Sequence, residues 1–281
     1  MDNYKILAAI VAFNPNIDQL QRNIRAIVPQ VDDVIVMDNA SQNGEKIEKI
    51  CLENSIIYWK KTCNEGIAKP LNDVFGYAKG KYDWVITLDQ DSVCELDYIK
   101  KASRYFSSEK IGIISTVYYE KNFGKIIGTV KEENKYQYVK RVITSAAIVN
   151  VKAYEKTCGY DELLFLDYVD FDFSVKIRQA GYKILRMNDS VLTHELGNSS
   201  VRHFLIWSFR LSSHSPEREF NIAKSIVIYI RKYYKTENIQ RDVLSLCKHF
   251  LLAVTYETEK KAKLKSLIKG VVEGMKTPIL I

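Results

Sequence analysis

The fold expected for this chain is decided by nine residues, Trp84-Val85-Ile86-Thr87-Leu88-Asp89-Gln90-Asp91-Ser92. The first five form an apolar run typical of a buried strand, and two aspartates follow directly where that strand ends. Carboxylates two positions apart supply the hard oxygen ligands that Mg²⁺ and Mn²⁺ prefer, so the spacing favours a site for a divalent cation and a diphosphate. The alternative is a helix N-cap, because Asp and Ser often begin helices.

Similar apolar runs precede this strand and alternate with segments of helical period, which is typical of an α/β domain with a mostly parallel sheet. We expect strands over Ile6 to Ala12, Val34 to Met37, Ile56 to Trp59 and Trp84 to Leu88, and helices over Ile17 to Ile27, Lys46 to Glu53 and Ile67 to Ala78. Open α/β sheets bind ligands beyond the carboxyl ends of their strands. The polar residues at those ends are therefore the candidate site: Asn14, Asp38, Asn39, Asn64, Asp89 and Asp91.

The second half of the chain is expected to change from mixed strands to helices. Residues 111–151 have a mixed strand pattern, and a helix is expected from Asp167 to a terminating Gly181. From about Val201 onward the pattern is interpreted as helical, with helices over Ile222 to Tyr234, Val243 to Val254 and Lys260 to Met275.

A second acidic cluster opens the helix expected from Asp167, where three carboxylates alternate with aromatic residues up to Phe173. Aromatic surroundings desolvate a carboxylate and raise its pKa, which suits a general base. Acids in a first helical turn also stabilise the helix dipole, so the pattern alone leaves both interpretations open. His194, at the end of a short strand, is a candidate third metal ligand or a structural histidine.

Composition excludes several other classes of protein. The chain has 281 residues, 47% of them hydrophobic and 27% charged, which argues against disorder, collagen-like repeats and a coiled-coil rod. No apolar run approaches the roughly 18 to 20 residues of a membrane-spanning helix, and no signal peptide is recognised, so we expect a cytoplasmic protein. Five scattered cysteines without a C-x-x-C pair indicate buried, reduced thiols and neither a disulfide framework nor a zinc site.

Seven stretches, taken in order, resemble the family 2 glycosyltransferases and within them the bacterial rhamnosyltransferase-like branch. They cover about residues 4 to 200. The stretches are VAFNPN (Val11 to Asn16), VIVMDNAS (Val34 to Ser41), NEGIAKPLN (Asn64 to Asn72), WVITLDQDS (Trp84 to Ser92), TSAAIVN (Thr144 to Asn150), DYVDFDFSVKIRQAGYKI (Asp167 to Ile184) and THELG (Thr193 to Gly197).

The resemblance implies a type A glycosyltransferase fold, with a Rossmann-like, mostly parallel central sheet, flanking helices and a C-terminal helical extension. Residues 1–200 would be the catalytic domain, with a nucleotide-binding half over about 1–92 and an acceptor-binding half over 93–200. Residues 201–281 would be the basic helical extension. The reaction implied is the inverting transfer of a sugar from a nucleotide diphosphate sugar to a glycan acceptor.

The resemblance also implies roles for individual residues. Phe13, Asn14 and Pro15 would line the base pocket, Asp38 would hold the base edge with Asn39 close by, and Asn64, Gly66, Ala68 and Asn72 would pack beneath the nucleotide. Asp89 would contact the ribose or support the metal, Gln90 would lie in the substrate site, and Asp91 and His194 would bind Mn²⁺ or Mg²⁺.

The catalytic base implied by the resemblance is Asp170, with Arg178 and Gly181 fixing the register of the motif. Asp172 would be either an acid that supports the site from behind or an acid on the acceptor side, and Lys176 and Arg178 would contact substrate. Two positions depart from the family pattern. Lys176 replaces the usual arginine and makes a less rigid contact, and only Arg218 matches the motif that usually follows Ser215-Pro216.

The C-terminal region carries most of the excess positive charge. The whole chain has a net charge of +7, and residues 215–281 contribute 13 basic and 7 acidic residues, a difference of +6. Basic helices with apolar faces bind anionic bilayers, so we expect peripheral contact with the inner face of the cell membrane, where a polyprenyl-linked acceptor would be met. The alternatives are a helix that packs on the catalytic domain and a homodimer contact. No nucleic-acid module is recognised.

The donor sugar is not fixed by these motifs. The branch favours dTDP-rhamnose and a role in bacterial surface polysaccharide synthesis, as capsule, exopolysaccharide or O-antigen. UDP-linked galactose, glucose or galactofuranose fits the same motifs. A non-catalytic nucleotide-sugar-binding subunit and a nucleotidyltransferase are the other hypotheses. The non-catalytic subunit is disfavoured because all four candidate residues for catalysis and metal binding are present, namely Asp89, Asp91, Asp170 and His194. The nucleotidyltransferase is disfavoured because the first loop is neither glycine-rich nor basic.

Overall fold

The computed structural model describes residues 4–108, 110–120, 125–127, 134–194, 199–204, 207–212, 214–256 and 258–279. The chain divides into two compact units, each formed by two stretches of sequence. The first unit comprises Met1–Glu162 and Asp170–Glu195, and the second comprises Leu163–Val169 and Leu196–Ile281.

The first unit is built on a nine-stranded sheet with the order β3-β2-β1-β4-β8-β5-β9-β7, in which β6 pairs with β5. The four strands β3, β2, β1 and β4 are mutually parallel, β8 is antiparallel to both of its neighbours, and β5 and β9 are parallel to each other. The strands are β1 (Ile6–Ala12), β2 (Asp33–Asp38), β3 (Ile57–Lys60), β4 (Trp84–Asp89), β5 (Ile111–Glu120), β6 (Lys125–Ile127), β7 (Tyr136–Tyr138), β8 (Ala147–Asn150) and β9 (Lys183–His194).

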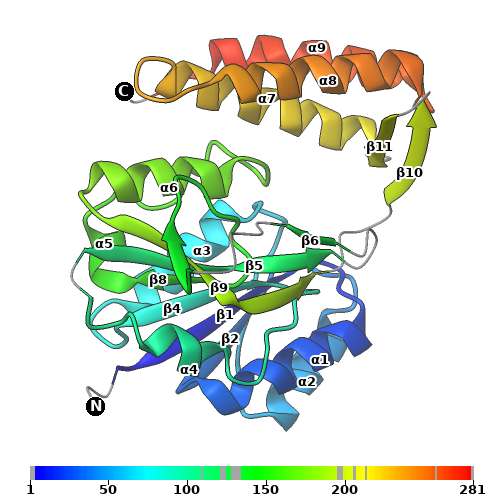
Figure 1. Ribbon diagram of the computed structural model, residues 1–281. Helices are drawn as coiled ribbons and strands as arrows, with labels where there is room; N and C mark the ends of the chain where they lie inside the picture. Colours follow the sequence, from blue (N-terminus) through cyan, green and yellow to red (C-terminus); the bar gives the residue numbers. More distant parts are fainter. Residues whose placement is uncertain are drawn as a thin grey trace. The chain divides into compact units, whose positions relative to one another are not determined.

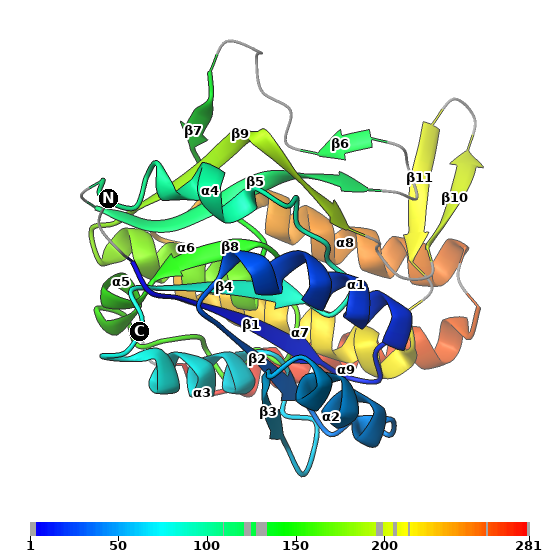
Figure 2. The same cartoon turned by 90° about the horizontal axis from the view of Figure 1, so that it is seen from below.

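Helices cover both faces of this sheet (Figure 1). Helices α1, α2 and α4 lie on one face and α3, α5 and α6 lie on the other, and the same arrangement is visible after a quarter turn (Figure 2). The helices are α1 (Ile17–Ile27), the short 3₁₀ helix η1 (Val28–Gln30), α2 (Gly44–Glu53), α3 (Ala68–Ala78), α4 (Tyr98–Ser103), α5 (Val151–Glu155) and α6 (Val169–Gln179). The expected α/β architecture, with a mostly parallel sheet and flanking helices, is confirmed.

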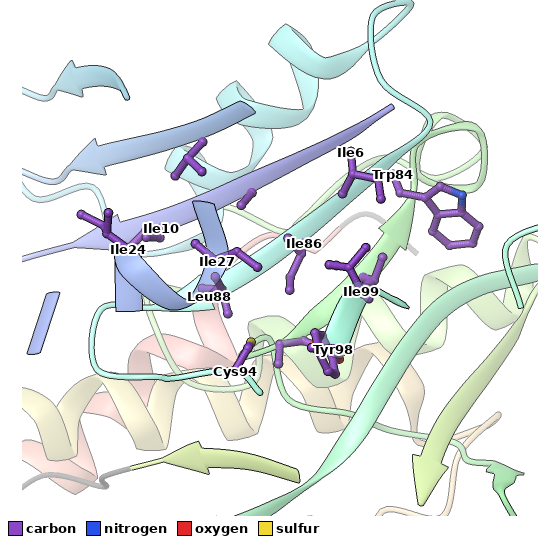
Figure 3. Packing of buried hydrophobic residues seen from close by; sticks show 14 of the residues in the cluster. Ile6, Ile10, Ile24, Ile27, Trp84, Ile86, Leu88, Cys94, Tyr98 and Ile99 are labelled. Carbon is purple, nitrogen blue, oxygen red and sulfur yellow. The ribbon is translucent and has the colours of Figure 1, made fainter. Parts of the chain in front are cut away.

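The core between the sheet and α1 forms because both elements bury aliphatic side chains at their own period. Strand β1 is buried over almost its whole length, and α1 presents Leu20, Ile24 and Ile27 to it at helical spacing. Figure 3 shows Ile24 beside Ile10 of β1 and Ile27 beside Leu88 and Ile86 of β4, with Tyr98 and Ile99 of α4 in the same cluster. Helix α1 begins at the N-cap Asn16, whose side chain accepts a hydrogen bond from the Gln19 N–H. This buried cluster joins β1, β2 and β4 to the helices on one face of the sheet and so fixes where the loops after these strands begin.

The second unit contains a two-stranded hairpin and three long helices. The hairpin pairs β10 (Ser199–Phe204) with β11 (Trp207–Ser212), and the helices are α7 (Pro216–Tyr233), α8 (Gln240–Thr255) and α9 (Lys260–Lys276). Helices α7 and α9 approach closely at two glycines of α9. A Cβ built on Gly270 would lie 2.4 Å from the Phe220 carbonyl oxygen, and one on Gly274 would lie 2.8 Å from the Val227 Cβ. Only glycine allows this distance between the two helices.

Two expectations from the sequence are wrong. The helix expected from about Val201 is a hairpin, because apolar and polar residues alternate from Trp207 to Ser212 with the period of a strand. Cys51 and Cys94 are buried, and burial raises the pKa of each thiol to about 12, but Cys63, Cys158 and Cys247 are exposed. All five thiols are free, as expected.

Candidate active site

The loops that follow β1, β2, β3 and β4 meet at one edge of the sheet, because these strands run parallel and end together. Hydrogen bonds join the loops directly. The Phe13 N–H donates to Gln90 Oε1 at 2.7 Å, and the Asn14 N–H donates to Ser41 Oγ at 2.9 Å. The candidate residues after the first, second and fourth strands are therefore parts of one assembly.

The first loop is held in an unusual backbone conformation. Asn14 has φ 48°, in the left-handed region that asparagine tolerates better than most residues. Its Oδ1 accepts a hydrogen bond from the Gln42 N–H at 2.8 Å, and the Pro15 carbonyl accepts one from Asn43 Nδ2 at 2.9 Å. Phe13 is 44% exposed, so the loop presents an aromatic ring to solvent at the edge where open α/β sheets generally bind ligands.

Asp38 is a fully buried carboxylate with both oxygens engaged. Oδ1 accepts from the Ser41 N–H at 2.8 Å, and Oδ2 accepts from the Tyr58 hydroxyl at 2.7 Å. Burial, and then the hydrogen bond to Asp38, raise the pKa of Tyr58 well above its ordinary value, so this phenol stays a donor. A buried charge is tolerated only when it is hydrogen-bonded, and here two donors on neighbouring elements fix its position.

Asn39 connects the second loop to the third. Its Nδ2 donates to Asn64 Oδ1 and to the Gly66 carbonyl, both at 2.8 Å, and its Oδ1 accepts from the Glu65 N–H at 3.0 Å. Gly66 has φ 75°, which glycine adopts readily, and the turn leads into α3 at the buried Ala68. The third loop is thereby brought to the same edge.

Asn72, one turn into α3, joins this loop region to the chain around residue 160. Its Nδ2 donates to the Tyr160 carbonyl and Glu162 Oε1, and its Oδ1 accepts from the Tyr154 hydroxyl and the Tyr160 N–H, at 2.8 to 3.0 Å. With these four hydrogen bonds, Asn72 holds the chain around residue 160 against α3.

The turn Asp89–Asp91 is fixed through its backbone by two side chains of α1. Asn23 Nδ2 donates to the Asp89 carbonyl at 2.8 Å, and Gln19 Nε2 donates to the Asp91 carbonyl at 3.1 Å. Gln90, which is expected to lie in the substrate site, accepts the Phe13 N–H. The two carboxylates are half-buried, at the end of β4.

Of the metal ligands expected from the sequence, the structure describes the side chains of Asp89 and Asp91. His194 is the last residue of β9, paired in register with Glu120, and its side chain lies outside the described residues. Among the side chains that the structure does describe, no group of three or more His, Cys, Asp or Glu is placed to hold a metal ion.

Asp170 lies in the first turn of α6 and lines a pocket with Thr144, Tyr160 and Ser174. The pocket is connected to β4, because the Thr87 hydroxyl donates to the Thr144 carbonyl at 2.6 Å and the hydroxyls of Ser92 and Ser145 are hydrogen-bonded. The segment from Thr144 to Ala146 therefore links the turn at Asp89–Asp91 to the pocket of Asp170.

Asp172 faces away from Asp170, because two residues on a helix are separated by about 200°. Its side chain is fully buried and lies 2.9 Å from Lys176 Nζ, which also donates to the Gly159 carbonyl at 2.9 Å. Arg178 Nε donates to the Lys140 carbonyl at 3.2 Å. Lys176 and Arg178 therefore fasten α6 to neighbouring segments, and Asp172 holds Lys176. The substrate contacts expected of these residues stay predictions.

Several residues of the site were not singled out from the sequence: Gln19, Asn23, Ser41, Gln42, Tyr58 and Thr144. Asn23 could have been identified from the sequence, because it is a polar residue on the apolar face of the expected helix, beside Leu20, Ile24 and Ile27, and it is fully buried in the structure. Buried polar side chains require partners, and its partner is the backbone of the acidic turn.

Comparisons with known proteins agree with this architecture. Residues 8–155, more than half of the chain, match the family model of Glycosyl transferase family 2. The chain is 26% identical over 297 aligned residues to dTDP-rhamnosyl transferase RfbF of Shigella flexneri, with 98% of this chain and 96% of that protein covered.

Solved structures of glycosyltransferases share the fold. The structure of GalNAc-T7 with UDP, GalNAc and Mn²⁺ superposes with a TM-score of 0.64 at 14% identity, and the match covers 98% of this chain and 57% of that one. Residues 1–349 of S. aureus TarS superpose with a TM-score of 0.58 at 14% identity, covering 97% and 81%. The type A fold expected from the sequence is confirmed. The chain is a glycosyltransferase and belongs to glycosyl transferase family 2.

Proposed function

We propose that this enzyme transfers rhamnose from dTDP-rhamnose to a hydroxyl group of a glycan acceptor in the synthesis of a bacterial surface polysaccharide. The observation that carries the proposal is the similarity to a dTDP-rhamnosyl transferase over nearly the full length of both chains. A match confined to residues 8–155 would support the family alone. The match here extends through the acceptor half and the C-terminal helices, which is where acceptor and pathway would be specified.

The donor nucleotide is proposed to bind at the carboxyl edge of β1–β4. The exposed ring of Phe13 offers a stacking surface for the base, and the fixed carboxylate of Asp38 offers an acceptor for a base N–H. Asn14, Pro15, Asn39, Asn64 and Gly66 shape the pocket through the hydrogen bonds described above. Ala68 and Asn72 support it from beneath, and Asp89 is proposed to contact the ribose.

A divalent cation, Mn²⁺ or Mg²⁺, is proposed at the acidic turn after β4. Asp89 and Asp91 are hard oxygen donors in a turn whose backbone is fixed by α1, which suits an ion held by one or two carboxylates together with the phosphates of its substrate. His194, which ends β9, is the proposed third ligand. When bound, the ion neutralises charge on the departing diphosphate.

Asp170 is proposed as the general base. Its carboxylate takes the proton of the acceptor hydroxyl as that oxygen forms a bond to the anomeric carbon, and the bond from this carbon to the nucleotide diphosphate breaks. Attack from the face opposite the leaving group inverts the anomeric centre in a single displacement. The position of Asp170 in the lining of a pocket with Thr144, Tyr160 and Ser174 supports this role.

The C-terminal helices are proposed to contact an anionic membrane surface. No helix in the part of the chain that the structure describes is long and apolar enough to span a bilayer. On α9, Ile268, Val272 and Met275 are exposed along one face at helical spacing, and Lys261 and Lys265 are exposed on the same face. Apolar side chains among lysines are typical of a surface-bound helix, and a polyprenyl-linked acceptor would be met there. A homodimer contact through the same face is the alternative.

The donor site is tested by thermal shift with dTDP, UDP or GDP, each with Mn²⁺, Mg²⁺ or EDTA, on the native enzyme, Asp91→Ala and the matched control Asp97→Ala. Asp97 is exposed and pairs with Lys101 at the surface, so its removal has little effect on stability. Metal-dependent stabilisation by dTDP, lost only in Asp91→Ala, is the expected result.

Each other outcome corrects a named part of the proposal. The same pattern with UDP moves the donor to a UDP-sugar, and no stabilisation by any nucleotide supports a non-catalytic subunit. Asp170→Asn should bind nucleotide normally and lose turnover. Full activity in this variant rules out Asp170 as the base.

A further inference from the structure

The seven residues that precede Asp170 belong to the compact unit formed by the C-terminal helices. Leu163–Val169 groups with residues 196–281, whereas Asp170 and the rest of α6 group with the sheet. Helix α6 begins at Val169, so this segment leads directly into the turn that carries the proposed base. Its contacts with α7 and α8 therefore bear on where the helix starts.

Two residues of the segment are held by specific side chains. Asp167 Oδ1 lies 2.9 Å from Arg218 Nη2 of α7, with a hydrogen bond between them. The Tyr168 hydroxyl donates to Asp242 Oδ1 of α8 at 3.1 Å, and its ring lies 5.2 Å from the ring of Tyr229 on α7, centroid to centroid. The segment is thus fastened to both helices.

Tyr168 has a backbone conformation that requires such support. Its φ is 69°, in the left-handed region that bulky residues rarely adopt. Conformations of this kind persist only where the surrounding structure fixes them, and they are concentrated at functional sites. Asp242 is 2% exposed, so the carboxylate that accepts from Tyr168 is itself fixed by burial. The direction in which the chain enters α6 is set at this residue.

We propose that Tyr168 and Arg218 are positioning residues for the transfer reaction: the C-terminal helices hold the segment before α6 so that the Asp170 carboxylate is placed for proton abstraction. The inference rests on the proposed role of Asp170. It assigns the C-terminal helices a function in turnover in addition to any membrane contact. Arg218 is the one residue of the motif after Ser215-Pro216 that matches the family pattern, and this role accounts for it.

The test uses the full chain with Tyr168→Phe, which keeps the ring contact and removes the hydroxyl, and with Arg218→Met. The matched control is Arg231→Met. Arg231, also on α7, donates to the carbonyls of Gly274 and Thr277 at 2.6 and 2.8 Å, on α9 and just after it, and not to residues 163–169. Activity is followed as hydrolysis of dTDP-rhamnose, in which water takes the place of the acceptor hydroxyl, and dTDP affinity is measured separately.

The expected result is a fall in kcat of roughly tenfold to a hundredfold in Tyr168→Phe and Arg218→Met, as misplacement of a reacting group produces. KM and dTDP affinity stay at native values, Arg231→Met keeps native kcat, and Arg218→Lys recovers part of the loss. Equal kcat losses in Arg231→Met and Arg218→Met, or native kcat in both segment variants, would overturn the proposal.

Amide hydrogen exchange provides a second readout that needs no turnover. Exchange at residues 169–172 should rise in Tyr168→Phe and stay native in Arg231→Met, and unchanged exchange in Tyr168→Phe overturns the inference. Native activity in Asp170→Asn would instead refute the proposed base, so the two failures are distinguishable.

Discussion

Replacing Gly270 with alanine tests whether the close approach of α7 and α9 holds the second unit together. The new Cβ would lie 2.4 Å from the Phe220 carbonyl oxygen and 2.9 Å from the Ala223 Cβ, where real Cβ atoms essentially never come within 3.0 Å. The oxygen belongs to the backbone of α7, so it cannot move alone, and the two helices must separate.

Two opposing contributions set the magnitude. Overpacking of this kind costs about 1 to 3 kcal/mol. Replacing a glycine inside a helix by alanine gains about 1 kcal/mol from propensity. The difference is a net loss of about 0 to 2 kcal/mol in the free energy of unfolding. We expect a value near the upper end, because the clash is with backbone and cannot be relieved by rotation of a side chain.

The matched control is Gly76→Ala in α3, where an added Cβ meets nothing within 4 Å. This variant gains the propensity and has no clash, so its stability should rise by about 0.5 to 1 kcal/mol. Urea unfolding followed by circular dichroism compares the two. A Gly270→Ala variant as stable as the native protein, alongside a stabilised Gly76→Ala, would refute the packing argument.

Three further predictions concern the site, the charge state and the thiols. Tyr58→Phe leaves a buried Asp38 oxygen without its hydroxyl donor and should weaken nucleotide binding and stability by about 1 to 3 kcal/mol, measured by calorimetry and urea unfolding; unchanged values would argue against a fixed carboxylate. Burial, and next the charge of Arg218, lower the pKa of His214, so on acidification the unfolded chain takes up this proton before the folded one and the free energy of unfolding falls between about pH 7.5 and about pH 5.5. Urea unfolding of His214→Gln at these two pH values should show a smaller fall than the native protein, and an equal fall would show that His214 does not contribute to it. A thiol reagent should modify the three exposed cysteines in the native protein and all five only after denaturation, and rapid native modification of five would contradict the burial of two.

The first strands and helices were predictable because their residues are buried at the period of their own element. Strand β1 and helix α1 have the expected bounds, because the sequence itself contains an unbroken aliphatic run for the strand and a capping residue, Asn16, before the helix. The hairpin after residue 198 was missed, because its alternation is short and lies beside strongly helical sequence.

The candidate site was predictable as a set of residues and less so as a set of contacts. Parallel strands must end at one edge, so Asp38, Asn39 and Asp89 could be brought together from the sequence alone. The partners that fix them, such as Tyr58 on a different strand, depend on long-range packing that no local pattern encodes. The ion pair between Asp172 and Lys176 is local, four residues apart on α6, but the full burial of Asp172 depends on the elements packed around that helix.

Residues 163–169 belong to the C-terminal unit although they precede Asp170 in the chain, and this affects the order in which contacts form during folding. During synthesis the sheet and its first loops can form while later residues are still being added, but the partners of Asp167 and Tyr168 lie on α7 and α8. The segment before the proposed base therefore reaches its final contacts only after α8, residues 240–255, has emerged. A chain shortened to residues 1–200 would lack the partners of Asp167 and Tyr168, so the proposal predicts that it is not a minimal form of the enzyme.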